Sequence, residues 1–216
     1  VEPNQGAEPT DPMDVRIVYD ETTLWIGARM ESRTAPIQAP LSRRDDGAQA
    51  EHILIELDPY LDRRTSFTFG VTASGVRLDH YQPSDNEDDA DTLWDPVWQA
   101  RASRTETSWT AELRIPFTQL RFNESNEGVF GLNVKRWRPS NNEQDYWVMI
   151  GRTERGWASR FGDVTGLERR APRKRLELLP YVAEGSRVTG NRNPANPFDG
   201  GRNLQRRIGL DMKTGI

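Results

Sequence analysis

The stretch EHILIELDPYLDRRTSFTFGVTASGVRLDHY, residues 51–81, decides the fold that we expect. Side chains of a β-strand point alternately to its two faces. The first arm carries one apolar and one mixed face, made of Ile53, Ile55 and Leu57 against His52, Leu54, Glu56 and Asp58. The second arm repeats this pattern with Phe67, Phe69, Val71 and Ala73 against Thr68, Gly70 and Thr72. Both arms are therefore predicted to be half-buried strands.

A third strand is predicted directly after these two arms. Turn-prone and charged residues join the arms at residues 59–64, and Ser74 and Gly75 end the second arm. A further alternation then begins at Val76 and continues through Leu78 to His80. Three strands joined by short turns are typical of an antiparallel meander.

The rest of the first 167 residues continues as short strands with frequent turns. Upstream of the meander, residues 15–19 and 24–30 are predicted to form a hairpin, and residues 31–50 a long ordered loop. Downstream, the pattern predicts a second hairpin, one helical turn and two more strands, at residues 97–105 with 108–115, 116–122, 130–134 and 146–150. Helical periodicity is absent, so the prediction is an all-β fold, an antiparallel β-sandwich.

The composition changes after Leu167, which divides the chain into three predicted parts: a sandwich at residues 1–167, a basic linker at 168–175 and a further segment at 176–216. In the last segment two strand-like stretches flank a loop rich in Asn, Pro and Gly. Ile208, Leu210 and Met212 alternate there with small or polar residues. This alternation is typical of a strand in a transmembrane β-barrel, and on composition alone an exposed hairpin fits equally well.

Charge and composition exclude several classes of function. The 29 basic and 33 acidic residues give a net charge of −4, which does not favour nucleic acid as a partner. The chain has no cysteine, so disulfides, zinc-thiolate sites and cysteine nucleophiles are excluded. No apolar run reaches the roughly 20 residues of a membrane-spanning helix. The first residues lack an initiator methionine and the profile of a signal peptide, so we expect a fragment or a mature chain.

Several motifs of the central stretch carry a resemblance to a known family. They are the hydrophobic-Glu-hydrophobic-Asp-Pro run at residues 55–59, Asp-Arg-Arg-Thr at 62–65, Ser-Gly-Val-Arg-Leu-Asp at 74–79 and the Arg-Arg-Asp-Asp box at 43–46. In this order they resemble the family 9 type of carbohydrate-binding domain, a DOMON-like β-sandwich. The likeness is greatest to the form at the N-terminus of uncharacterised bacterial outer-membrane β-barrel proteins, and it covers most of the chain.

The resemblance implies a function and a place in the cell. Two facing aromatic rings would grip a terminal sugar of a polysaccharide or oligosaccharide, and charged residues would bind its hydroxyls. Residues 176–216 would be the truncated start of an outer-membrane barrel, with the sandwich periplasmic or exposed at the cell surface. Calcium binding occurs in domains of this family.

Seven tryptophans provide candidate sugar platforms. A pyranose ring stacks its apolar face on a flat aromatic ring, and its hydroxyls need charged or amide partners. Trp109 shares the phase of Leu113 and is assigned to the core, and Trp25 and Trp98 are weaker candidates. The platforms that remain are Trp94, Trp137 and Trp147, and the candidate polar partners are Arg43, Arg44, Asp46 and Glu56. The alternatives are that the indoles only pack and that the Arg-Asp pairs are structural salt bridges.

An acidic loop at residues 84–91 is a candidate calcium site. Asp85, Glu87 and Asp89 place carboxylates at alternate positions, and hard oxygen ligands suit Ca²⁺. An EF-hand is excluded, because Ala90 stands where the motif needs glycine and no glutamate closes the loop. The alternative is a solvated acidic loop.

Catalysis is not expected from this sequence. Only His52 and His80 could serve as imidazole bases, and neither lies in a nucleophile motif. Glycine-rich phosphate loops are absent, and no pair of carboxylates stands out as a glycosidase site. We therefore expect non-catalytic glycan binding by aromatic stacking. The alternative is a structural or protein-interaction domain of an outer-membrane barrel without a sugar site.

Overall fold

The computed structural model describes residues 1–47, 49–120, 128–151, 153–167, 175–188, 195 and 201–215. At residues 175–177, 202–203 and 213–215 it describes the backbone only. The chain divides into two compact units, Val1–Ala171 and Pro172–Ile216. This division falls inside the predicted linker, whose residues 168–174 lie outside the described part of the chain.

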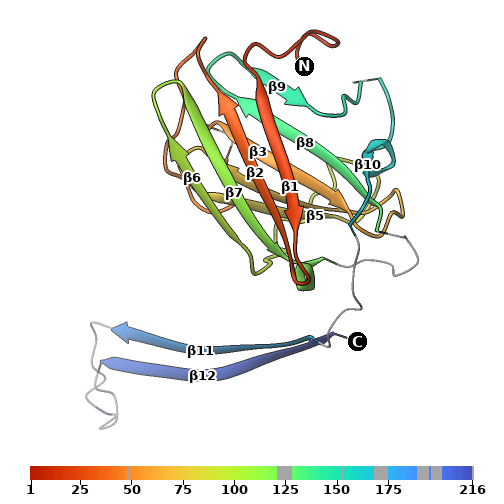
Figure 1. The fold of residues 1–216 in the computed structure, drawn as a ribbon. Helices are drawn as coiled ribbons and strands as arrows, with labels where there is room; N and C mark the ends of the chain where they lie inside the picture. Colours follow the sequence, from red (N-terminus) through yellow and green to blue (C-terminus); the bar gives the residue numbers. More distant parts are fainter. Residues whose placement is uncertain are drawn as a thin grey trace. The chain divides into compact units, whose positions relative to one another are not determined.

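The first unit is a β-sandwich, drawn with most of its strands labelled in Figure 1. One sheet has the strand order β1-β2-β7-β6, and the other has the order β10-β8-β3-β4-β5, with β9 also paired to β8. All of these pairings are antiparallel. The bounds are β1 Met13–Tyr19, β2 Thr23–Glu31, β3 His52–Asp58, β4 Ser66–Thr72, β5 Arg77–Gln82, β6 Gln99–Arg104, β7 Ser108–Pro116, β8 Phe130–Arg138, β9 Glu143–Tyr146 and β10 Gly162–Val164. The predicted antiparallel sandwich is confirmed.

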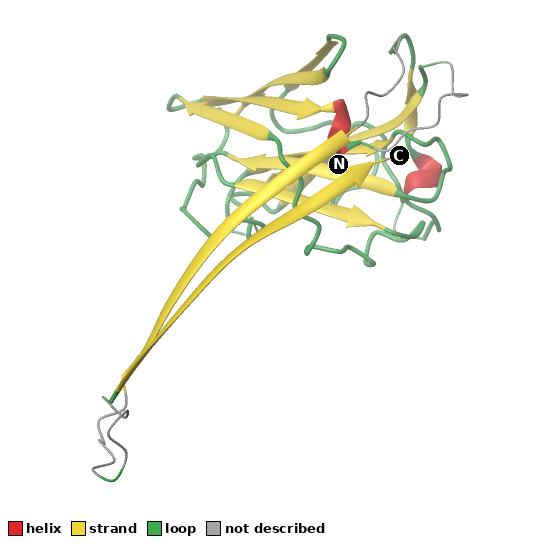
Figure 2. Ribbon diagram, turned by 90° about the horizontal axis from the view of Figure 1, so that it is seen from below, coloured by secondary structure: helices red, strands yellow, loops and turns green. Residues whose placement is uncertain are grey.

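Two short helical turns complete this unit, and strands otherwise dominate, as Figure 2 shows. They are η1 at Phe117–Gln119 and η2 at Ala158–Arg160. The helical turn expected at residues 116–122 is thus present, although residues 121–127 lie outside the described part. The loop expected at residues 31–50 is also present, between β2 and β3.

The core between the sheets is built from the apolar phases of the strands. Ile53, Ile55, Phe67 and Phe69 are at most 5% exposed and pack with the inward residues of β2, β7 and β8. Each such residue removes apolar surface from water, which is worth about 1.5–3 kcal/mol for a large side chain. The predicted meander and the two predicted hairpins are all confirmed.

The prediction of half-buried strands is wrong for β4 and holds only for the first half of β3, where His52 and Leu54 are partly exposed. Every residue of β4 is buried, including the polar phase of Thr68 and Thr72. In β2, by contrast, buried and exposed residues alternate. Segments without regular strands cover the second face of the larger sheet. One of them brings Gly47 against Leu78 on β5, and another brings the ring of Trp157 against Lys135 on β8.

The strand expected at residues 146–150 is also corrected. The strand β9 ends at Tyr146 and does not include Val148 or Ile150. The side chain of Asn133 replaces the ladder there, because its Oδ1 accepts from the Val148 amide at 2.9 Å and its Nδ2 donates to the Val148 carbonyl at 3.1 Å. A side chain thus satisfies the backbone groups that another strand would have paired.

Two arginines are fully buried on the core side of β8. Arg136 is paired with Glu51, whose Oε1 also accepts from the indole of Trp109 at 2.8 Å. Arg138 is paired with Asp11 at 2.6 Å and with Glu143 at 2.9 Å. These pairs fix the segments before β1 and β3 to the sandwich, and they satisfy charges that would otherwise be costly to bury.

The second unit is a hairpin of two long strands, β11 Arg175–Val188 and β12 Arg202–Gly215. The register pairs Leu178 with Met212 and Val182 with Ile208, so these apolar residues share one face. Tyr181, Asp211 and Arg207 lie on the other face. No helix in the described part of the chain is long and apolar enough to cross a membrane. The loop expected at 189–201 is described only at Ala195 and Gly201.

Candidate functional site

A cleft of about 570 Å³ lies in the sandwich unit, bordered by the acidic loop and by the segment that follows β9. Its lining combines two aromatic rings with many charged groups. The residues are Glu2, Asp85, Asn86, Glu87, Asp88, Tyr146, Ile150, Gly151, Glu154, Arg155, Gly156 and Trp157. Pockets of this size hold small molecules, so the cleft is the candidate functional site.

Lys135 lies behind the aromatic wall of the cleft. Its ammonium nitrogen is 4.6 Å from the ring centroid of Trp157 and 5.6 Å from that of Tyr146. It forms an ion pair with Glu87 of the acidic loop and lies 4.0 Å from a carboxylate oxygen of Glu56. One cation thus holds the loop, the sheet and the aromatic wall together.

The environment of Lys135 shifts the titration of its neighbours. Burial raises the pKa of Glu56 to about 7, Lys135 acts against this rise, and Glu87 adds to it. Burial lowers the pKa of His80 to about 4, and Lys135 lowers it further. Burial also raises the pKa of Tyr146 to about 12, so this phenol stays neutral and can donate a hydrogen bond. Because the pKa of His80 lies well below neutral pH, its imidazole carries no charge there.

Asp85 positions the far wall of the cleft. Its carboxylate accepts from the backbone amides of Trp157 at 2.7 Å and Ser159 at 2.9 Å, and from the Ser159 hydroxyl at 2.6 Å. Although burial acts in the opposite direction, these hydrogen bonds lower the pKa of Asp85, which keeps it ionised. Gly156 has φ of +96°, and a Cβ there would collide with Asp85 and Ser159. Only glycine fits this turn without strain.

The aromatic wall is itself held from behind. Trp157 is 3% exposed and meets Phe161 edge-on, with ring centroids 5.8 Å apart. Its indole N–H has no hydrogen-bond partner among the described residues. At the other end, Glu2 pairs with Gln144 of β9 through two backbone hydrogen bonds of 2.8 and 3.1 Å. The N-terminal segment therefore forms part of the cleft.

Solved structures with the same architecture bind saccharides or are thought to. A Bacteroides uniformis protein with a proposed role in carbohydrate binding is 14% identical, with a TM-score of 0.57, and the match covers 71% of this chain and 77% of that one. A family 9 carbohydrate-binding module from Caldicellulosiruptor kristjanssonii, solved with glucose, is 15% identical, with a TM-score of 0.54 and coverage of 78% and 82%. The sandwich has the family 9 carbohydrate-binding fold. The same module solved with cellotriose gives 15% identity, a TM-score of 0.52 and coverage of 77% and 80%.

Comparison at the level of sequence adds no relative. No protein-family model matches the chain, and no curated protein matches it. The family 9 fold is thus established by structural likeness, and the ligand has to be argued from the site.

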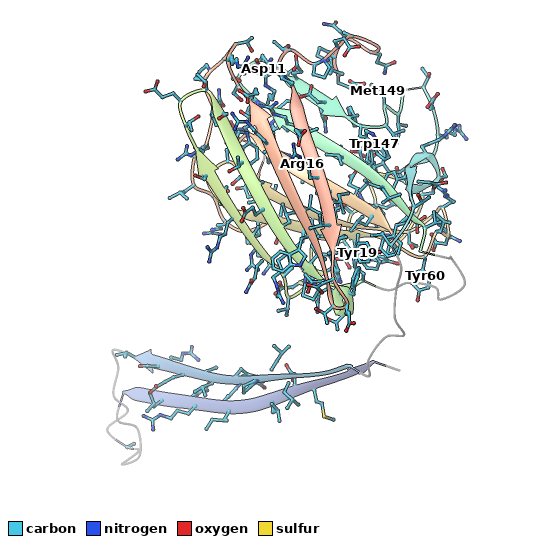
Figure 3. The ribbon with its side chains drawn as sticks, in the orientation of Figure 1. Asp11, Arg16, Tyr19, Tyr60, Trp147 and Met149 are labelled. Atoms are coloured by element: carbon cyan, nitrogen blue, oxygen red, sulfur yellow. The ribbon has the colours of Figure 1, made fainter. Side chains whose placement is uncertain are left out.

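Within this family 9 fold, the three nominated tryptophans lie apart from the cleft lining. Trp94 packs against Phe67 and Phe69, with centroid distances of 5.1 and 5.4 Å, at the edge of the core. Trp137 is half-buried and opposite His52 in the register. Trp147, labelled in Figure 3, is 52% exposed and directly follows β9. None of the three lines the cleft.

The nominated polar partners are also dispersed. Arg44 is paired with Asp79 at 2.7 Å and with Asp95 at 2.6 Å. Asp79 also accepts from the indole of Trp98 at 3.0 Å, so this pair belongs to the packing of the sandwich. Arg43 and Asp46 are exposed and do not line the cleft. Glu56 is buried beneath it, beside Lys135.

The expected calcium ligands are not brought together. Asp85 accepts from Trp157 and Ser159, Glu87 pairs with Lys135, and Asp89 accepts from the hydroxyl of Ser84. No group of three or more His, Cys, Asp or Glu residues in the described ranges is arranged to hold a metal ion. The acidic loop instead supports one wall of the cleft.

The residues that form the site were missed because their signals are weak in the sequence. Lys135 stands between Val134 and Arg136, where it resembles any outward residue of a half-buried strand. The sequence pattern places Tyr146 at the start of a strand, whereas it is the last residue of β9. Trp157 follows Gly156 in a polar loop, and this glycine with positive φ before an aromatic residue was the one local sign of a fixed turn.

Proposed function

We propose that the cleft binds a saccharide without chemical conversion. The observation that carries this proposal is the pairing of an aromatic wall, Tyr146 and Trp157, with charged groups in one cleft. Sugars need this combination, because their C–H faces pack on rings and their hydroxyls need polar partners.

Tyr146 is the ring best placed to stack on a sugar. It is half-buried and lines the cleft, whereas Trp157 is almost fully covered and supports it. Glu87 and Asp88 offer carboxylate oxygens to hydroxyl donors, and Arg155 offers N–H groups to ring and hydroxyl oxygens. The glucose and cellotriose bound by the structural neighbours support a glycan ligand for the same fold here.

The test is calorimetric titration of the chain with glucose, cellotriose and a panel of other oligosaccharides. Tyr146→Ala is expected to weaken binding at least about tenfold, since a stacked aromatic contributes roughly 0.5–1.5 kcal/mol beyond its buried area. Trp147→Ala is the matched control, because Trp147 is the next residue and does not line the cleft. Loss of binding in Trp147→Ala alone would move the platform outside the cleft. No binding of any saccharide would favour a structural or protein-interaction domain.

We also propose that the hairpin unit associates with a membrane, as an element of an outer-membrane protein of the bacterial cell envelope. What supports this is its one-sided apolar face, on which Val182 is 76%, Ile208 84% and Met212 67% exposed. Large exposed apolar patches of this kind mark contact with lipid or protein. The strands of 14 residues exceed the roughly 9–11 residues that a tilted transmembrane strand needs.

Flotation with phospholipid vesicles tests this second proposal. The chain is expected to float with vesicles, and the double variant Val182→Asp/Ile208→Asp is expected to stay behind, because both residues of this register pair lie on the apolar face. Ala183→Asp is the control, since Ala183 pairs with Arg207 on the opposite face. Equal behaviour of the two variants, or a chain that does not float, would remove the membrane proposal.

A further inference from the structure

We infer that the cleft selects saccharides that carry free amino groups over neutral and acidic ones. This inference rests on the proposed saccharide binding and names the ligand class of the same site. It is carried by the charges around the cleft and by an ammonium that its wall already accepts.

The described lining of the cleft is strongly acidic. Five carboxylates line it, from Glu2, Asp85, Glu87, Asp88 and Glu154, against the single cation of Arg155 among the described lining residues. The carboxylate of Asp85 accepts hydrogen bonds from the Trp157 amide and the Ser159 hydroxyl, and that of Glu154 accepts one from the Gly151 amide. The carboxylate of Asp88 lines the cleft and is exposed to solvent. A cleft lined by one sign of charge concentrates ligands of the opposite sign.

The wall of the cleft already stabilises an ammonium group. Lys135 places its ammonium against the rings of Trp157 and Tyr146 and pairs with Glu87, all of which also line the cleft. Aromatic faces and carboxylates are the groups that stabilise organic cations. Tyr146 and the exposed carboxylate of Asp88 offer the same two kinds of group to an amine on the ligand, whereas a uronate or a sulfate would meet the carboxylates of the loop.

The experiment compares trisaccharides of equal length by calorimetry at a pH of about 6, where amines are protonated and most carboxylates are ionised. The ligands are the trimers of glucosamine, N-acetylglucosamine, glucose and a uronic acid. The glucosamine trimer is expected to bind at least about fivefold more tightly than the glucose trimer, which is the ratio that one or two exposed ion pairs supply. In about 1 M salt, where the screening length falls to about 3 Å, this preference is expected to disappear.

Charge variants tie the preference to the cleft. Asp88→Asn is expected to reduce the ratio of glucosamine to glucose affinity to about twofold. The matched control is Glu106→Gln, an exposed carboxylate in the turn between β6 and β7, which is expected to leave the ratio unchanged. Unchanged melting temperatures of both variants would show that the effect is not one of folding.

The possible outcomes separate this inference from the proposed function. Equal affinity for all four trimers, or a preference for the uronate, would overturn the amine selectivity and leave saccharide binding intact. No binding of any trimer would overturn both. A preference that survives high salt, or that Asp88→Asn does not reduce, would also overturn the inference, since its source would not be the carboxylates of the cleft.

Discussion

Lys135 and Arg136 are neighbours on β8, and each forms ion pairs with different carboxylates on opposite faces of the strand. Lys135 lies on the face below the cleft, with Glu56 and Glu87. Arg136 lies on the core face, with Glu51. Both side chains are buried, so each ion pair has lost most of its hydration and depends on its partner.

Replacement of Lys135 by methionine is expected to destabilise the fold more at alkaline than at acid pH. Lys135 is the group that holds the pKa of Glu56 down, and burial already raises it to about 7. Because its pKa is raised in the folded state, protonated Glu56 stabilises the fold. This stabilisation is present at low pH and is lost as pH rises through about 7. We expect a loss of about 3 kcal/mol at a pH of about 8 and a smaller loss at about 5.

Urea unfolding at these two pH values measures the effect. The double variant Lys135→Met/Glu56→Gln is expected to recover most of the loss at alkaline pH, because no buried charge then remains unpaired. An equal loss at both pH values would show that Lys135 acts by packing alone.

Arg136→Met is expected to be among the most damaging single changes on the core face. Among the described residues it would leave the carboxylate of Glu51, which is 1% exposed, with Ser32 and Trp109 as its side-chain donors. Breaking a buried pair costs about 3–5 kcal/mol. Arg16→Met is the control, because Arg16 on β1 pairs with Asp14 in full contact with water (Figure 3). Similar melting temperatures for the two variants would contradict this prediction.

At the scale of elements, the segment after β9 decides the shape of the cleft. Asn133 binds both backbone groups of Val148 and thereby turns the chain away from the strand ladder. The segment then continues to Trp157 and forms the cleft wall. A buried side chain, rather than a strand partner, therefore sets the position of the site.

Asn133→Ala is expected to loosen this wall. The Val148 amide would lose its acceptor, so hydrogen exchange at residues 147–157 should speed up at least about tenfold, the change that accompanies roughly 1.4 kcal/mol of local stability. Asn141→Ala is the control, since the Asn141 side chain donates to Glu143 at 3.4 Å on the surface. Unchanged exchange in Asn133→Ala would show that the wall is held by other contacts.

The same element shows where prediction from sequence succeeds and where it fails. Alternation predicted β1 to β8 because the core faces of these strands carry apolar residues, large ones in β4, such as Phe67, Phe69 and Val71, and only alanines in β6. It failed at residues 146–150, because the alternation of Tyr146, Val148 and Ile150 has no strand to pair with. The site was missed for a related reason, since Lys135 and Trp157 meet only through a long-range contact that no local pattern encodes.

At the scale of the molecule, buried acids should shape the response of the whole fold to pH. Burial and the nearby Glu143 raise the pKa of Asp145 to about 7, and neither of its oxygens has a hydrogen-bond partner. With Glu56, this predicts that the free energy of unfolding falls as pH rises from about 6.5 to about 8, by an amount on the order of 2 kcal/mol. Below about 6.5 the buried His80, whose pKa is lowered to about 4, opposes this fall. Asp20 acts in the opposite sense, because hydrogen bonds from Thr22 and Trp25 lower its pKa to about 2, so stability is also lost in strong acid.

Thermal melts across this range, with Asp145→Asn, check the prediction. The variant is expected to reduce the fall above a pH of about 6.5, because the amide cannot ionise. Asp14→Asn, an exposed carboxylate, should keep the profile of the unaltered chain. A profile that rises between a pH of about 6.5 and 8 would contradict the assignment of a neutral Asp145.

Burial on both faces of β4 also limits how this chain can vary. A saturation scan of single substitutions should find β2 tolerant at every second position, since Trp25, Gly27 and Arg29 face solvent. In β4 it should find no tolerant phase, because the residues opposite the core lie under the covering segments. Sequence change among descendants of this chain would then fall mainly in the smaller sheet and the loops. The sequence of β4 would stay nearly fixed even if the ligand of the protein changed.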